Sequence, residues 1–112
     1  MTKPKVGDIL RCSWGWDQTN VDWYEVIKTT PSGVRIRKIN GKAVDNDRVV
    51  PVKGSWETAP SYKKDDPLYS EKGAVKRVRP SRDGYAVTIT DYASAYLWDG
   101  KPAYETPFNC GH

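Results

Sequence analysis

Apolar and polar residues alternate with a period of two over much of the first half of the chain, which is typical of half-buried β-strands. Three stretches show this pattern, at residues 6–14, 22–29 and 34–39. The third alternates most clearly, since Val34 and Ile36 would face inward while Arg35 and Arg37 face outward. The pattern predicts three consecutive strands.

Turn-forming residues stand between these stretches. Thr30-Pro-Ser-Gly33 predicts a type I turn in which Gly33 adopts a positive φ, as a hairpin with a bulge requires. Asn40-Gly41 is a strong two-residue hairpin signal and leads into residues 42–44. The first half is therefore predicted to be a meander of three or four antiparallel strands.

The second half is patterned less clearly. Residues 48–52 resemble an edge strand interrupted by Pro51, and further strands are predicted at 74–79, before Pro80, and at 85–89. Thr90-Asp91 could cap a short helix over residues 92–99, with Gly100 ending it. Continuation of the preceding strand through the same residues is the alternative.

The 112 residues fit a single domain, 1–112. Residues 1–5 are predicted to be a loose lead-in, 54–73 a long loop held by aromatic residues, and 101–112 an irregular tail that docks on the domain. The predicted fold is mostly β, either a small bent antiparallel sheet or an SH3-like barrel, with one short C-terminal helix near residues 91–98 as an optional element.

Composition adds two constraints. Apolar residues make up 38% and the mean hydropathy is -0.74, so the core must depend on aromatic side chains. Eighteen Lys and Arg against fourteen Asp and Glu give a net charge of +4, which permits a polyanionic partner without requiring one. No apolar run reaches the roughly 18 residues of a membrane span, and no signal peptide is evident. We therefore expect a cytoplasmic protein without a membrane partner, in which Cys12 and Cys110 are reduced thiols.

The sequence does not favour an enzyme. It has no phosphate-binding glycine loop and no common hydrolase or metalloprotease motif, and its one histidine is His112 at the chain end. Cys110 and His112, even with Cys12, fall short of the four ligands of a structural zinc. No catalytic residue, metal or cofactor is predicted.

Two basic segments are candidates for binding nucleic acid. They comprise Arg35, Arg37 and Lys38 in the first half and Lys76, Arg77 and Arg79 in the second. If their strands are neighbours, these side chains would form one cationic patch suited to phosphates. The alternative is that they only solvate the outer face of a sheet and protect its edges.

The stretch 14–24 is the densest in aromatic residues. Its candidate partner-binding residues are Trp14, Trp16, Asp17, Gln18, Asn20 and Trp23. It is either a hairpin loop supported by aromatic side chains or a binding edge for another macromolecule. Because aliphatic residues are few, at least one of the three tryptophans is expected in the core.

The run Trp14-Gly-Trp-Asp-Gln-Thr-Asn-Val-Asp-Trp-Tyr-Glu-Val26 resembles a signature of small uncharacterised proteins of bacteriophages and mobile elements. Residues 97–102 and the final Gly111-His112 are similar to the C-terminus of the same family. The resemblance implies a phage or plasmid origin and a site of action in the bacterial cytoplasm, and it transfers no functional residue. The expected function is a non-enzymatic accessory protein that binds nucleic acid through Arg and Trp. The alternative is a binder or inhibitor of a host protein, such as a defence-system component, through the 14–24 stretch.

Overall fold

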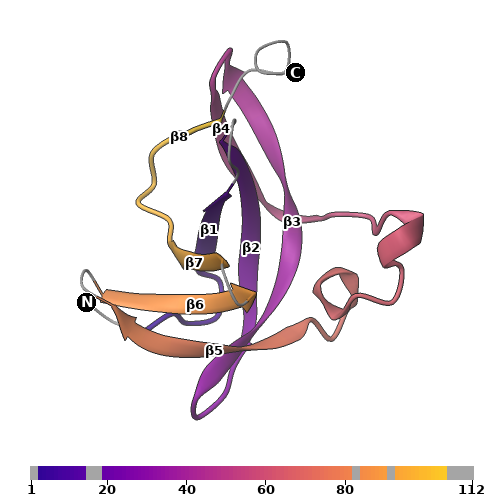
Figure 1. Cartoon of the computed structure of the whole chain (residues 1–112), viewed down its shortest axis with the longest axis vertical. Helices are drawn as coiled ribbons and strands as arrows, with labels where there is room; N and C mark the ends of the chain where they lie inside the picture. The colour runs from indigo at the N-terminus through magenta and orange to yellow at the C-terminus, as the bar shows by residue number, and fades with distance from the viewer. Residues whose placement is uncertain (1–2, 15–18, 82–83, 91–92, 106–112) are drawn as a thin grey trace.

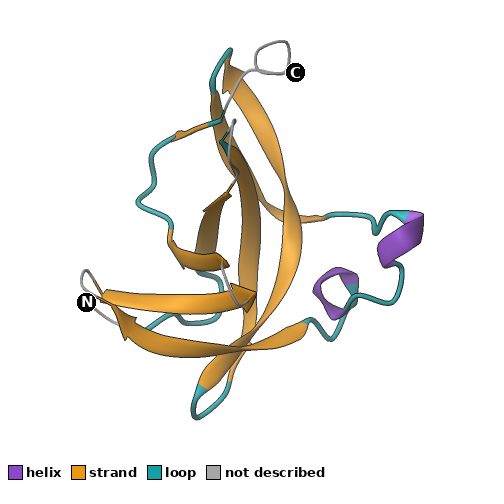
Figure 2. Cartoon of the chain, in the orientation of Figure 1, coloured by secondary structure: helices purple, strands orange, loops and turns teal. Residues whose placement is uncertain are grey.

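The computed structural model describes residues 3–14, 19–81, 84–90 and 93–105. Strands account for 63% of these residues, and no α-helix occurs among them (Figures 1 and 2). The strands are β1 (Ile9–Trp14), β2 (Asn20–Thr29), β3 (Gly33–Asp45), β4 (Arg48–Trp56), β5 (Ala74–Ser81), β6 (Gly84–Thr90), β7 (Ala93–Leu97) and β8 (Ala103–Tyr104). Two short 3-10 turns, η1 (Ser61–Lys63) and η2 (Pro67–Tyr69), lie between β4 and β5.

Six of the strands close into an antiparallel barrel. The order is β2-β1-β7-β6-β5-β3, and a β2–β3 pairing joins the two ends. In Figure 1, β5 and β6 run across the long direction of β2 and β3, as expected of a strongly bent sheet. The predicted mostly-β antiparallel fold is thus confirmed, in its closed form.

Strand β3 is longer than the barrel requires, and it changes its neighbour along its length. Its first residues, 33–36, pair with β5, whereas its second half pairs with β4 from Ile39 onward. Strand β4 in turn pairs with β8. The strands β4 and β8 therefore form an extension outside the barrel.

The barrel interior is filled by small and medium apolar side chains together with one tyrosine. They are Leu10, Cys12, Tyr24, Val26, Val34, Ile36, Val87, Ile89 and Ala95. Val34 and Ile36 are among the most buried, so the predicted inward face of β3 is confirmed. Leu68 of η2 packs against the same cluster and fastens the segment that follows β4.

A second apolar cluster lies on the outer side of β2 and β3, under the extension. It consists of Val21, Trp23, Ile39 and Ala103, with Trp98 packed against it. The rings of Trp23 and Trp98 meet edge to face, with centroids 5.7 Å apart. Trp23 is only 2% exposed, which confirms that at least one tryptophan of the aromatic stretch belongs to the core.

Gly33 and Gly41 were both predicted to be turn glycines, but the structure requires glycine at these positions for other reasons. Asn40-Gly41 does not form a hairpin, because β3 continues through it to Asp45 and the chain turns immediately before Arg48. A Cβ atom on Gly41 would lie 2.9 Å from Cδ1 and Nε1 of Trp23, so the indole ring occupies the space of a side chain. Gly33 is not among the glycines with positive φ. Its Cβ would lie 2.2 Å from the Lys76 carbonyl oxygen, so the close approach of β5 requires glycine there.

The short helix predicted over residues 92–99 is wrong for the residues described, since Ala93–Leu97 form β7. This strand pairs with β6 on one side and with β1 on the other, and without it the barrel would remain open. Ala95 is completely buried in the interior. Long-range pairing therefore outweighs the local capping signal of Thr90 and Gly100.

The less patterned segments differ in detail from expectation. Strand β4 extends to Trp56 and so includes the first residues of the stretch expected to be a loop, and β5 continues through Pro80 to Ser81. The tail contributes β8, and its residues 106–112 lie outside the described part. In the lead-in, the Lys5 amide donates a hydrogen bond of 2.8 Å to Asp8.

Replacement of Trp23 by alanine should lower the free energy of unfolding by about 3–5 kcal/mol, because it removes the centre of the outer cluster. Trp14, which is 51% exposed, is the matched control. Trp14→Ala should cost about 1 kcal/mol, the contribution of one hydrogen bond. Urea unfolding followed by circular dichroism measures both, and equal losses for the two variants would contradict the assignment of Trp23 to the core.

Candidate nucleic-acid interface

The two basic segments recognised in the sequence lie on adjacent strands. In the β3–β5 pair, Arg35 is opposite Val75 and Gly33 is opposite Arg77. Because Val34 and Ile36 fill the interior, Arg35 projects from the outer face of the barrel. Arg77 is exposed on the same face of the next strand, diagonal to Arg35.

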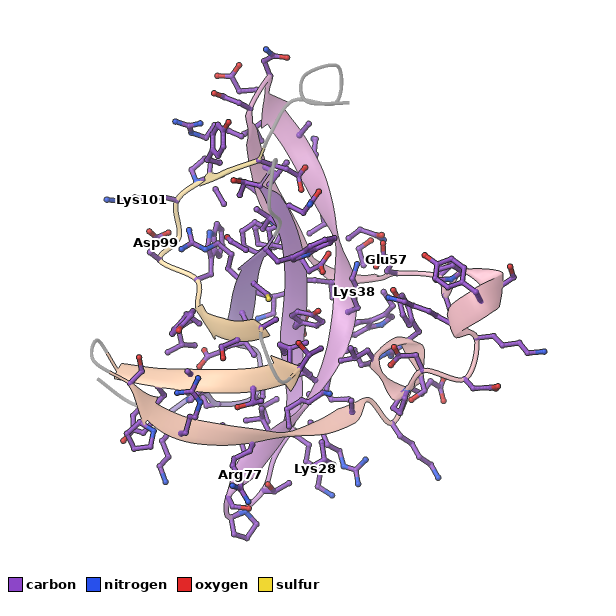
Figure 3. All side chains as sticks on the ribbon, viewed as in Figure 1. Lys28, Lys38, Glu57, Arg77, Asp99 and Lys101 are labelled. Atoms are coloured by element: carbon purple, nitrogen blue, oxygen red, sulfur yellow. The ribbon has the colours of Figure 1, made fainter. Side chains whose placement is uncertain are left out.

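Five cations occupy this outer face, which we term the outer basic face. They are Lys28, Arg35, Lys72, Arg77 and Arg79. Lys28 lies directly opposite Arg35 in the β2–β3 pair, and Arg35 donates a hydrogen bond of 3.4 Å to the backbone carbonyl of the exposed Lys72. Lys28 and Arg77 extend from the same end of the molecule (Figure 3).

The outer basic face is not neutralised within the described part of the chain. The ion pairs found among those residues involve Lys38 and Arg48 and none of the five cations. The acidic residue nearest in sequence is Glu71, an exposed neighbour of Lys72. Like charges directly opposite each other on a sheet are destabilising, so the Lys28–Arg35 arrangement is unfavourable for folding alone.

Arg37 and Lys38 do not belong to this face. The Arg37 guanidinium stacks over Trp56, 4.1 Å from the ring centroid. The Lys38 ammonium forms ion pairs with Glu57 and with Asp22, the latter at 3.5 Å, and Figure 3 shows Lys38 and Glu57 side by side. Both cations therefore already interact with side chains of the protein itself.

The environment of Lys38 keeps it charged. Burial lowers its pKa, but the hydrogen bond to Glu57 and the negative charges of Asp22 and Glu57 outweigh burial, and the pKa is raised above its ordinary value. Burial, followed by the charge of Asp22, also raises the pKa of Tyr24 far above its usual range. Lys38 is thus a structural cation at the end of the barrel.

Lys76 also differs from its expected role. It alternates with the exposed Arg77 and therefore lies on the inner side of β5. Its ammonium donates a hydrogen bond of 3.0 Å to the Ile89 carbonyl. Of the six predicted phosphate-binding residues, Arg35, Arg77 and Arg79 are brought together on the outer basic face, and Arg37, Lys38 and Lys76 are not.

The residues of the aromatic stretch do not share one surface. Trp23 is buried in the outer cluster, so it is a core residue instead of a contact for a partner. Trp14 is exposed, and its Nε1 donates a hydrogen bond of 2.9 Å to Asp22. Asn20 pairs with Trp14 across β1 and β2 and is half-buried. The remaining candidates, Trp16, Asp17 and Gln18, lie outside the described residues.

A pocket of about 280 Å³ lies against β2, β3 and β4, at the edge of the outer cluster. Its lining includes the ammonium-bearing Lys38 and three carboxylate residues, Asp22, Glu57 and Glu105. The excess of negative charge opposes the entry of a phosphate group. This pocket therefore does not extend the outer basic face.

Sequence reasoning missed Tyr96, an exposed aromatic residue on β7. Tyr96 pairs with Ala86 of β6, which in turn pairs with Arg79 of β5. The alternation of Ser94 and Tyr96 with Ala95 could have identified it, but this signal depends on treating residues 93–97 as a strand.

The described residues were also expected to lack a metal site and a membrane span. Among the described residues, no group of three or more His, Cys, Asp or Glu side chains is arranged to hold a metal ion. Within the same residues, no helix has the length and apolar character needed to cross a bilayer. Cys110 and His112 lie outside this part of the chain.

Comparison of the chain with models of protein families, with curated proteins and with solved structures finds no match.

Substitution of Lys38 by methionine should lower the free energy of unfolding by about 1–3 kcal/mol, since it leaves two partly buried carboxylates without their cation. Arg77→Ala removes an exposed cation of the outer basic face and should change stability by no more than about 0.5 kcal/mol. Chemical denaturation separates the two roles. A stable Lys38→Met variant together with an unstable Arg77→Ala variant would reverse the assignment.

The Cys12 thiol is buried in the barrel, and burial followed by the charge of Asp22 raises its pKa to about 11. In a Cys110→Ser background, Cys12 should remain unreactive toward a disulfide reagent at pH 8–9 in the folded protein, because the thiolate is the reactive form. The same thiol should react at once in denaturant. Rapid reaction of folded protein would show that Cys12 is accessible. In the unsubstituted protein, absence of thiol reaction after unfolding without reductant would contradict the prediction that Cys12 and Cys110 are reduced.

Proposed function

We propose that the protein is a non-enzymatic binding module that contacts the phosphate backbone of a nucleic acid through the outer basic face. The observation that carries the proposal is the placement of Arg35 between like-charged neighbours, with Lys28 directly opposite and Arg77 diagonal to it. Two other cations of the described chain, Lys38 and Arg48, are instead paired with carboxylates. The repulsion between these like charges lowers the stability of the protein alone, and it is reduced when bound phosphates neutralise the charges.

The sheet also supports the arginine side chains in a way that suits phosphate binding. Arg35 is fixed by its hydrogen bond to the Lys72 carbonyl, and Arg79 by a hydrogen bond of 3.0 Å to Ser94. Neither bond involves a carboxylate, so the positive charge stays available. Guanidinium groups on rigid strands bind phosphate oxygens at a lower entropic cost than freely rotating side chains.

The biological setting is part of the same proposal. The resemblance of residues 14–26 to small phage and mobile-element proteins supports an accessory role in a bacterial host. Nucleic acid is available in the host cytoplasm, where reduced thiols are also the usual state.

A host-protein partner at the 14–24 stretch is the second candidate. One observation favours it, the exposed ring of Trp14. Its other aromatic anchor, Trp23, is buried, so this surface has fewer contact residues than the sequence suggested.

Binding to a short labelled oligonucleotide should weaken steeply as salt is added. Each neutralised phosphate contributes about 0.9 for a duplex, or about 0.7 for a single strand, to the slope of log K against log salt. Replacing Arg35, Arg77 and Arg79 together by alanine should flatten this slope by about 2–3 units while the melting temperature changes little. Fluorescence anisotropy at several salt concentrations measures the effect.

A matched control removes the same charge from other surfaces. Lys42, Lys64 and Lys101 are exposed cations outside the outer basic face, and their triple alanine variant should retain most of the slope. Equal slopes for the two triple variants would show only nonspecific attraction. No binding by the wild type at about 50 mM salt would end the nucleic-acid proposal. Loss of a host-protein partner in Trp14→Ala would then support the second candidate.

A further inference from the structure

An exposed aromatic residue lies beside the outer basic face. Tyr96 is 46% exposed on β7, and the barrel interior on this strand is occupied by its neighbour Ala95. Tyr96 therefore projects outward, on the same side of the sheet as Arg79 of β5, two strands away. Strands are spaced by about 4.8 Å, so the two backbone positions are roughly 10 Å apart.

Arg79 spans this gap with its side chain. Its Nη2 donates a hydrogen bond of 3.0 Å to the Ser94 hydroxyl on β7. Ser94 and Tyr96 are two residues apart on the same face, which is about 7 Å along the strand. The guanidinium of Arg79 is therefore held over β7 at Ser94, on the same face of this strand as Tyr96, by a neutral hydrogen-bond acceptor.

The burial of Ala86 agrees with this geometry. Ala86 points outward from β6, between Arg79 and Tyr96 in register, and yet it is 0% exposed. A small side chain on the outer face of a sheet becomes inaccessible when longer neighbours cover it. The arm of Arg79 and the ring of Tyr96 are the side chains in register on either side of it.

A second cation flanks the ring on the other side. Arg11 of β1 is paired with Tyr96 in the β1–β7 ladder, and it alternates with the interior residues Leu10 and Cys12. Arg11 is half-buried and faces outward. In register, Tyr96 thus lies between two arginines, in a row across four strands formed by Arg79, Ala86, Tyr96 and Arg11.

We propose that Tyr96 is a base-stacking platform and that the nucleic acid bound at the outer basic face is single-stranded. This inference rests on the proposed function and names the class of nucleic acid. An unpaired base can stack on the ring while the adjacent phosphates meet Arg79 and Arg11. In a duplex the bases are already stacked on each other, so Tyr96 would gain nothing from it beyond phosphate contacts.

The test compares a fluorescent oligothymidine with a duplex of equal length. Tyr96→Ala should weaken binding of the single strand by about 5- to 150-fold, the range for loss of one stacked base, and should leave the salt slope unchanged. Tyr96→Phe keeps the ring and should bind as the wild type does. Tyr96→Leu retains an apolar side chain over Ala86 without an aromatic face and should behave like the alanine variant, which separates stacking from a loss of folding.

Tyr62 is the matched control, since it is 81% exposed on η1 and lies on a different element from the row. Tyr62→Ala should leave affinity unchanged. Salt-dependent binding that favours the duplex, or equal affinities for Tyr96→Ala and Tyr62→Ala, would overturn the stacking proposal while the phosphate-binding proposal stands. The absence of salt-dependent binding to either oligonucleotide would overturn both.

Discussion

The pairing of β3 with three other strands is the constraint on which the rest of the structure depends. Between residues 34 and 36 it pairs with β2 on one side and β5 on the other, and this closes the barrel. From Ile39 onward β4 replaces β5, and the extension that covers Trp23 begins. The register of β3 therefore determines which residues fill the barrel interior, which form the outer cluster and which lie on the outer basic face. A shift of one residue would exchange Val34 and Ile36 with Arg35 and Arg37.

The same alternation separates structural from available cations. Lys38 and Lys76 follow the inward positions of their strands and are engaged at the barrel ends with Glu57 and the Ile89 carbonyl. Arg35 and Arg77 follow the outward positions and remain on the surface. Arg37 is also outward, but Trp56 covers it, because β4 lies beside this half of β3. The charge of a residue therefore does not show whether it is available for binding. Its inward or outward position in the strand, and the residue that lies beside it, do show this.

Local sequence patterns correctly predicted the features that depend on neighbouring residues, namely the faces and the positions of most strands. The alternation of Val34 to Arg37 identified both faces of β3, and the short apolar repeats located most strands. Contacts between distant residues were not accessible in this way. Gly41 is required by the ring of Trp23 and Gly33 by the backbone of β5, although both resemble turn glycines. The strand at 93–97 depends on β1 and β6, and for this reason its capping residues suggested a helix and Tyr96 was not recognised. The tryptophans posed a similar problem, since both sides of β2 are covered and alternation alone could not decide that Trp23 is buried while Trp14 is exposed.

We propose that nucleic acid contacts outward-facing residues of β3, β5 and, beyond the intervening β6, of β7. The most direct measurement is a titration of ¹⁵N-labelled protein with a short oligonucleotide, followed by amide chemical-shift changes. The account predicts that the changes concentrate at residues 33–36, 75–79 and 94–96, with little change around Trp14 and Asn20. Changes confined to the ends of β1 and β2 near Trp14, or no changes at all at low salt, would contradict it.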